Sequence, residues 1–269
     1  MLRGVRFVVG VFAASAFACS ASSESASTEG DGGGPPRSTA PDAGTPLDDA
    51  AVATSTPDTG VDGSNDAASA THVPIVFVHG INGSAADWDV MVQRFVDDGW
   101  PRASLKAETF PDPKWGCNTD NATTIAGWVD ALKKQTGAST VDLVAHSMGG
   151  LSSRYFLHDK GGVATVRRYV TVGSMHHGLT SPCLSPLDVC VWKELCATGA
   201  FIAGLDKAPV TPGPTAWWSI YSDGDGTVPV SSSQLSGATN QMIPGIPHSG
   251  VGGLQQAPEV YAAVKAALL

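Results

Sequence analysis

The chain has 269 residues and a formal net charge of −9, and charged residues make up 15% of it. The charge is uneven: residues 20–71 hold nine acidic residues and one basic residue, whereas residues 72–269 hold 16 acidic and 13 basic residues. This balance leaves no basic patch, so we expect no nucleic-acid partner. The roughly two hundred residues from 72 onward are enough for a single hydrophobic core.

The first 18 residues resemble an export signal. Two arginines precede an apolar run at residues 7–17, and a small-x-small cleavage site ends at Ala18. The run is too short to span a bilayer as a permanent helix. Cys19 follows at once and resembles the acylated cysteine of a bacterial lipoprotein. We therefore expect an exported protein that is anchored in a membrane through lipid on Cys19; plain secretion is the alternative.

Residues 19–71 form a segment of their own. They are almost all Ala, Ser, Thr, Gly, Pro and Asp, and they include no aromatic residue. Such a composition cannot bury enough apolar surface to offset its ordering entropy. We predict a flexible acidic tether here, followed by one folded domain at residues 72–269.

Four cysteines lie in the predicted domain, at positions 117, 183, 190 and 196. An even number in an exported protein predicts two disulfides. Three pairings are possible, and we expect Cys183 to pair with Cys190 and Cys117 with Cys196. The spacings do not match common zinc patterns, so metal binding is the weaker interpretation.

Strands and helices alternate along the domain. Apolar runs stopped by turn residues predict strands, and 3.6-residue periodicity predicts helices. This order predicts an α/β fold, with a mostly parallel sheet covered by helices on both faces. The segment 180–214 is the least regular, and it is either a lid or a stapled surface loop. The predicted strands are 74–80, 104–110, 140–145, 168–172, 217–222 and 241–246, and the predicted helices are 88–96, 121–136, 151–158 and 258–269.

A candidate nucleophile lies between one of these strands and the next helix. The stretch "AHSMG" has the spacing G-x-S-x-G, with Ala145 in place of the first glycine. Small residues two before and two after Ser147 suit a sharp strand-to-helix turn that exposes the hydroxyl. The alternative is a buried serine that caps a helix. A serine hydroxyl is a poor nucleophile without a base. The choice between these two interpretations therefore depends on whether the chain also supplies an acid and a histidine.

The expected chain order of such a site is serine, acid, histidine. Asp223 and Asp225 follow a predicted strand in "IYSDGDGTVPV", where a plain turn or a calcium loop is the alternative. His248 is the single histidine after this point, because the other six precede it. Two backbone N–H groups should stabilise an oxyanion, those of Met148 and of Ile81 in the glycine loop "HGINGS".

Taken together, "VHGINGS", "VDLVAHSMGGLSSRYF", "VGSMHHG", "YSDGDGTV" and "GIPHSG" resemble the class 2 bacterial lipases of the α/β-hydrolase superfamily. The resemblance covers roughly residues 74–267. It implies a compact α/β-hydrolase fold with Ser147 as nucleophile, Asp225 as acid and His248 as base. Ile81 and Met148 then donate to the oxyanion.

The same resemblance implies what the protein acts on. We expect a serine esterase or lipase that hydrolyses carboxylic esters, acylglycerols among them, through an acyl-enzyme. It should act as a monomer, and the mechanism requires no metal or organic cofactor. Polyester cleavage or acyl transfer on the same residues is the nearest alternative, and a tethered non-catalytic binding module is a more distant one.

Three tryptophans, Trp192, Trp217 and Trp218, either line an acyl groove or pack in the core.

Overall fold

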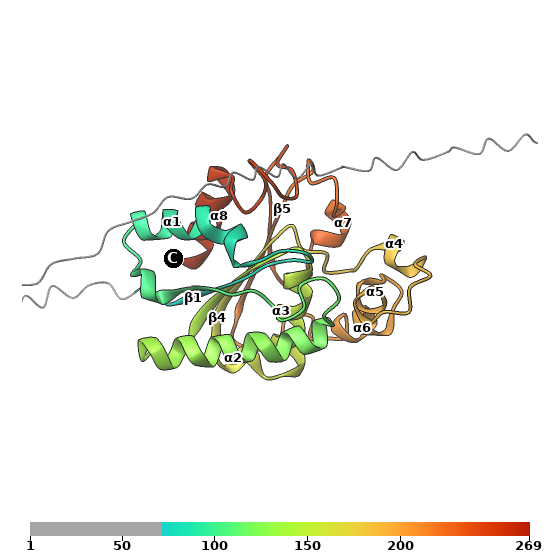
Figure 1. Ribbon diagram of the computed structural model, residues 1–269, viewed down its shortest axis with the longest axis horizontal. Coiled ribbons are helices and arrows are strands. Elements are labelled where there is room, and N and C mark those ends of the chain that lie inside the picture. The colour runs from blue at the N-terminus through green and yellow to red at the C-terminus, as the bar shows by residue number, and fades with distance from the viewer. Residues whose placement is uncertain (1–71) are drawn as a thin grey trace, which may run out of the picture. The chain divides into compact units, whose positions relative to one another are not determined.

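The computed structural model describes residues 72–269. The predicted export signal, tether and lipid site at Cys19 lie outside the described residues. Within them, six strands form one parallel sheet in the order β2-β1-β3-β4-β5-β6 (Figure 1). The strands are β1 Ile75–Val78, β2 Leu105–Ala107, β3 Val141–His146, β4 Val166–Val172, β5 Ala216–Tyr221 and β6 Thr239–Met242.

Helices cover both faces of this sheet, as Figure 1 shows. On one side lie α1 (Asp89–Asp97) and α8 (Pro258–Leu268), and on the other lie α2 (Asn118–Thr136) and α3 (Met148–Asp159). Successive side chains of a strand point to opposite faces. Accordingly Ile75 and Phe77 of β1 pack in the core under α1 and α8, whereas Val76 and Val78 pack in the core under α2. The predicted α/β architecture is therefore confirmed.

Shorter helical turns complete the described chain. Three of them, α4, α5 and α6, occupy the segment that we expected to be irregular. None of the helices within residues 72–269 is long and apolar enough to cross a membrane. The short elements are η1 Ala85–Trp88, η2 Arg102–Ser104, η3 Gly162–Ala164, α4 Thr180–Cys183, α5 Cys190–Leu195, α6 Ala200–Leu205 and α7 Val230–Ser233.

Two element boundaries differ from the sequence prediction in a way that bears on the site. Helix α3 begins at Met148 instead of position 151, so it includes Gly149 and Gly150. Glycine is a weak helix former, but both of these glycines are fully packed against neighbours. Strand β6 ends at Met242, and the chain then turns at Pro244 and at Gly245, whose φ is 74°.

The predicted disulfide pairing is wrong. The structure joins Cys117 to Cys190, with 5.4 Å between their Cα atoms, and Cys183 to Cys196, with 4.6 Å. The reason is tertiary: Leu179 forms a parallel β-bridge with Cys196, which brings the neighbouring α4 against the end of α5. Cys190, at the other end of α5, then faces the start of α2.

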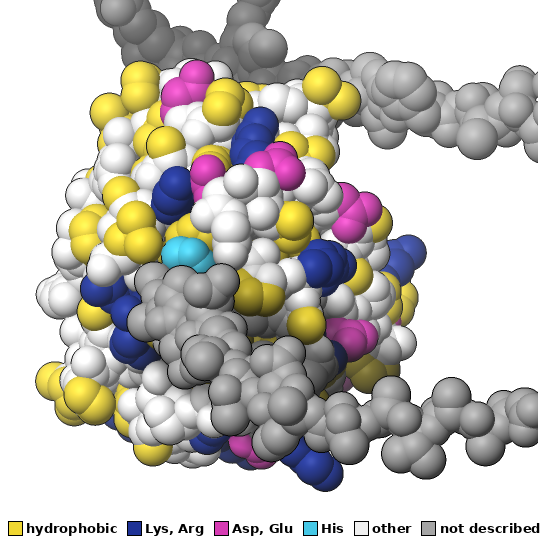
Figure 2. Space-filling view, turned by 90° about the vertical axis from the view of Figure 1, so that its left-hand side faces the viewer, with side chains coloured by type: hydrophobic (Ala, Val, Ile, Leu, Met, Phe, Trp, Pro, Cys, Tyr) yellow, Lys and Arg dark blue, Asp and Glu magenta, His cyan; other side chains and the backbone are white. Residues whose placement is uncertain are grey.

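Helices α1 and α8 are joined by polar contacts at their edge. Lys265 forms an ion pair with Asp98 at 2.7 Å, and the Tyr261 hydroxyl donates to the backbone carbonyl of Arg94 at 3.1 Å. Figure 2 shows the domain from the left-hand side of Figure 1, where basic and acidic side chains lie interspersed among apolar and uncharged groups. Such exposed ion pairs contribute little to stability.

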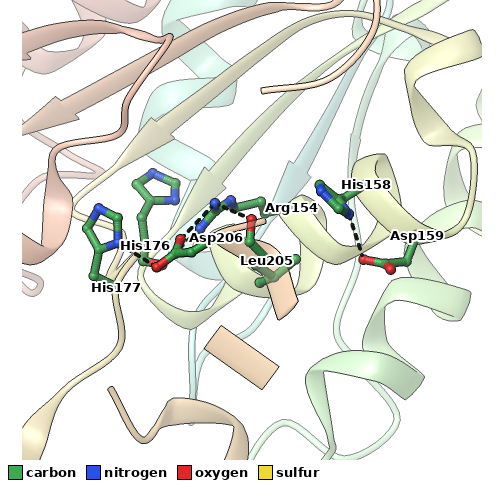
Figure 3. Close-up of polar contacts among 7 residues, drawn as sticks. All are labelled: Arg154, His158, Asp159, His176, His177, Leu205 and Asp206. Carbon is green, nitrogen blue, oxygen red and sulfur yellow. Dashed lines mark hydrogen bonds and ion pairs between the residues drawn. The ribbon is translucent and has the colours of Figure 1, made fainter. Parts of the chain in front are cut away.

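A buried arginine on α3 contributes more. Arg154 has no exposed surface, and Figure 3 shows its guanidinium between two other segments of the chain. It donates to the carbonyl of His176 at 3.0 Å, to the carbonyl of Leu205 at 2.7 Å and to the Asp206 carboxylate at 3.0 Å. Burial lowers the pKa of Arg154, and Asp206 opposes that shift. The side chain thus ties α3 to the loop after β4 and to the end of α6.

Replacing Arg154 with methionine should therefore destabilise the domain by about 3 kcal/mol, because two buried carbonyls and one carboxylate lose their donor. Urea unfolding followed by circular dichroism measures the change. Lys134→Met, an exposed cation on α2, is the matched control and should change stability by less than about 0.5 kcal/mol. Equal effects of the two substitutions would contradict this role of Arg154.

Candidate active site

Ser147 lies in the turn between β3 and α3, and its backbone is strained. Its φ is 55° and its ψ is −131°, and Asn82 is the other non-glycine residue with positive φ among residues 72–269. A non-glycine residue in this region is disfavoured by about 1–3 kcal/mol. The Ser147 side chain makes no capping hydrogen bond to α3. The helix-cap interpretation therefore does not describe what this hydroxyl does.

Two glycines allow the chain to pack tightly around this turn. A Cβ atom on Gly149 would lie 2.3 Å from the backbone oxygen of His79, and one on Gly80 would lie 2.7 Å from the Cβ of Ser147. Neither position can hold a larger residue without movement of backbone. The small residue two positions after the serine, Gly149, is thus required by the close approach of α3 to the end of β1, as the motif predicted.

The three residues predicted to form a triad lie together at the carboxyl edge of the sheet. Asp225 follows β5 and His248 follows β6. His248 Nδ1 lies 2.7 Å from Asp225 Oδ2, so the ring donates there and Nε2 remains an acceptor. The Ser147 hydroxyl lies 2.9 Å from that Nε2 and can donate to it. Residues more than one hundred positions apart in the chain are therefore connected by hydrogen bonds.

The hydrogen bonds around Asp225 favour its charged form. Burial alone would raise the pKa of this carboxyl, but His248 and the backbone N–H groups of Val228 and Thr227 lower it, and the net pKa is below its ordinary value. The second oxygen accepts from the N–H of Thr227 at 2.9 Å and of Val228 at 2.6 Å. Asp225 is thus a fixed anion behind the histidine ring. Asp223 is exposed and accepts from the N–H of Gly245 at 2.8 Å instead.

The glycine loop after β1 lies against the serine, and a histidine that sequence reasoning missed orients it. His79 is fully buried, and its Nε2 accepts from the N–H of Phe110 at 3.0 Å. Its Nδ1 therefore carries the hydrogen and donates to the carbonyl of Gly80 at 2.7 Å. In a trans peptide the following N–H, that of Ile81, points the opposite way. The histidine in "VHG" at a strand end was the available signal.

Both backbone donors predicted for the oxyanion lie next to Ser147. Ile81 lines the cavity in front of the serine, and Met148 is the first residue of α3. Among residues 72–269, neither N–H forms a hydrogen bond. The N-terminus of a helix carries a partial positive charge. The position between these two groups is therefore suited to a developing negative charge.

A cavity of about 590 Å³ opens in front of Ser147 and His248. Most of its apolar lining residues belong to one hydrophobic cluster and form an apolar side, and its polar lining residues include Asp87 and the buried Gln255. Of the three tryptophans considered above, Trp192 lines the cavity, whereas Trp217 and Trp218 belong to the core. The apolar side consists of Ile81, Met175, Leu179, Pro182, Trp192 and Leu195.

The apolar wall is tied down at several points. Both disulfides hold α4 and α5, and the Glu194 carboxylate accepts from the backbone N–H of Asn118 and, at 3.0 Å, from the Thr119 hydroxyl. Burial raises the pKa of Glu194, and these hydrogen bonds oppose the shift. Its position at the N-terminus of α2 also suits a carboxylate. The segment thus matches the predicted stapled surface loop better than a lid.

Candidate metal ligands come together at one place among the described residues. One cluster there brings three candidate ligand atoms together, from Cys117, Cys190 and Glu194. The two sulfurs of that cluster are bonded to each other, so neither is a free thiolate. The predicted calcium alternative at "DGDG" fails on geometry, because Asp225 is held by His248 and by backbone N–H groups.

The parallel sheet, the strained serine at its carboxyl edge and the paired histidine and aspartate define the α/β-hydrolase class of proteins. A family model described as Lipase (class 2) matches residues 72–250. This chain belongs to the class 2 lipase family and is a carboxylic ester hydrolase.

Solved structures agree with this fold. A lipase of Bacillus licheniformis, BlEst2 in its mature form, matches with a TM-score of 0.62 at 21% identity, covering 74% of this chain and 92% of that one. The product of gene lin2722 from Listeria innocua matches with a TM-score of 0.57 at 19% identity, over 73% and 94% of the two chains. Phospholipase PlaB from Legionella pneumophila matches with a TM-score of 0.61 at 14% identity, over 73% and 59%. The compact α/β-hydrolase prediction is thus confirmed.

Proposed function

We propose that this protein hydrolyses acylglycerols and related carboxylic esters through an acyl-enzyme on Ser147. One observation carries the proposal: a continuous hydrogen-bonded chain runs from the serine hydroxyl through His248 to the buried carboxylate of Asp225, with distances of 2.9 and 2.7 Å. A hydroxyl next to an acceptor nitrogen is activated as a nucleophile, and the anion behind the ring holds the required tautomer.

The steps follow from these contacts. As Ser147 Oγ attacks the ester carbonyl, its proton passes to His248 Nε2, and Asp225 stabilises the resulting imidazolium. The N–H groups of Ile81 and Met148 donate to the tetrahedral oxyanion. The intermediate collapses as His248 returns the proton to the leaving alcohol, and the acyl group stays on Ser147. Water then attacks the acyl-enzyme by the same route and releases the acid.

The cavity supports an ester with one apolar and one polar part. The apolar lining around Trp192 and Leu195 suits the acyl chain, and the polar lining residues Asp87 and Gln255 suit the alcohol. An acidic side chain in the lining favours a neutral alcohol such as glycerol over an anionic one. The family of the chain supports the same substrate class.

Export is the setting that the described residues favour. Two disulfides persist in oxidising compartments and are rare in a reducing cytosol. We propose that the protein is exported and anchored through lipid on Cys19, a residue that lies outside the described part of the chain.

Ser147→Ala should lower kcat on p-nitrophenyl butyrate by about 10³-fold or more, because the covalent route disappears. Initial rates at saturating ester measure the change, and a fluorophosphonate probe should label the wild-type protein at this residue only. Circular dichroism and the melting temperature should match those of the wild type. A folded variant with near-wild-type turnover would rule out this nucleophile.

Asp225→Asn should reduce kcat by about 10⁴-fold, because an amide no longer holds the histidine tautomer. Asp223→Asn is the matched control, since this exposed neighbour only accepts from the N–H of Gly245. Its rate should stay within about threefold of the wild type. Both rates are measured on one soluble ester, and the reverse ranking would move the acid to Asp223.

Cys19→Ser should release active enzyme from the membrane fraction of expressing cells without altering its rate on short esters. The reason is that the anchor would be covalent lipid, and serine cannot carry the thioether. Fractionation and mass spectrometry of the N-terminal peptide measure the outcome. A wild-type protein that is already free of membranes, with no acyl mass on that peptide, would favour plain secretion.

A further inference from the structure

A second buried histidine lies beside the site, and the mechanism above does not use it. His146 is the last residue of β3, and 4% of its surface is exposed. Its Nε2 lies 2.9 Å from the backbone carbonyl oxygen of His248. Since a carbonyl oxygen only accepts, Nε2 must carry the hydrogen and donate. The two imidazole rings lie side by side, with their centroids 4.5 Å apart and their planes tilted by 39°.

The ring of His146 is held in its neutral form. Burial, together with the neighbouring His248 ring, lowers the pKa of His146 to about 3. The imidazole therefore stays neutral across the neutral pH range. It provides one fixed N–H donor and places no second cation next to His248 when that ring becomes an imidazolium.

The loop that carries His248 is anchored before the histidine by the N–H groups of Gly245 and Ile246, and it is exposed directly after the histidine. It follows β6, contains Gly250 and Gly252 with positive φ, and includes Val251, which is 98% exposed. The N–H of His248 donates to the backbone carbonyl of Asp225 at 3.1 Å. Within the described residues, the carbonyl of His248 accepts from His146 and from no other group. Without the N–H of His146, the carbonyl oxygen of His248 would have no hydrogen-bond donor among the described residues.

We propose that His146 is a positioning residue that holds the catalytic base in register with the nucleophile. This inference rests on the proposed function. His146 and Ser147 are consecutive, and the strand β3 that ends at His146 is buried along its whole length. The hydrogen bond from His146 thus fixes the position of His248, which lies on a loop distant in sequence, relative to the adjacent Ser147. A displacement of about 1 Å between reacting groups can lower a rate by about 10²-fold.

Three substitutions separate this role from simple packing. The amide nitrogen of glutamine reaches about as far from the backbone as imidazole Nε2, so His146→Gln keeps a donor to the carbonyl. Asparagine is one carbon shorter, so His146→Asn keeps the polarity but not the reach. His146→Leu removes the donor altogether. His158→Leu is the matched control, because this histidine lies at the far end of α3 and pairs with Asp159 at 3.1 Å (Figure 3).

The measurements are kcat and KM on p-nitrophenyl butyrate and the rate of fluorophosphonate labelling at Ser147. His146→Asn and His146→Leu should lower kcat and the labelling rate by about 10-fold to 100-fold, with KM within about threefold of the wild type. His146→Gln should recover most of the loss, and His158→Leu should match the wild type. If His146→Leu does not fold, as judged by circular dichroism, the comparison of Gln with Asn decides.

Two results would overturn the inference alone: a folded His146→Leu variant with wild-type kcat, or equal kcat values for the Gln and Asn variants. The second result would mean that the ring only fills space. A different result would overturn the proposed function, and this inference with it: wild-type protein that hydrolyses the ester with no probe on Ser147.

Discussion

The left-handed backbone of Ser147 is the constraint on which the rest of the site depends. A strain of about 1–3 kcal/mol persists only where the surrounding packing holds it. Here β3 is buried along its whole length before the turn, and the first seven residues of α3 are buried after it. Relaxing the turn would pull α3 away from the end of β1, where Gly149 leaves no room for adjustment. The burial of β3 and α3 thus keeps Ser147 in a backbone conformation that is otherwise unfavourable.

The other groups of the site follow from the direction of the strands. In a parallel sheet every strand ends at the same edge, so the loops after β1, β3, β5 and β6 meet there. Each loop brings one kind of group: backbone donors, a hydroxyl, a carboxylate and an imidazole. Hydrogen bonds and burial then influence which side chains at this edge are charged. The pKa of Asp225 is lowered, and burial keeps His79 and His146 neutral by lowering theirs.

The segment from α4 to α6 gives the cavity its apolar side, and its order has a separate origin. It is too short and irregular to form a layer of its own. The Cys117–Cys190 disulfide and the carboxylate of Glu194 tie it to α2, and the buried guanidinium of Arg154 ties it to α3. The Cys183–Cys196 disulfide joins α4 to α5 within the segment. The wall that faces Ser147 is therefore held in part by α3, the same helix that begins directly after this serine. A change in the packing of α3 would therefore affect both the position of Ser147 and the stability of this wall.

Local sequence patterns were sufficient to predict much of this protein. Apolar runs between turn residues predicted the strands, because a strand buried on both faces is apolar throughout. A 3.6-residue periodicity predicted the four long helices, because a helix buried on one face repeats its apolar residues at that spacing. The sharp-turn motif located Ser147, and chain order reduced the histidine candidates to His248. These inferences needed no contact map, since each depends on residues close in sequence or on their order alone.

Other features depended on which distant segments meet. The disulfide pairing was predicted wrongly, because the bridge between Leu179 and Cys196 is not encoded in the cysteine spacing. The choice of Trp192 over two core tryptophans as a cavity residue has the same origin. So do the contacts of His79 and His146, whose ring nitrogens bond to backbone groups that pattern analysis cannot place. Such contacts form only when the folded sheet brings its loops together at one edge, so the tertiary structure decided them.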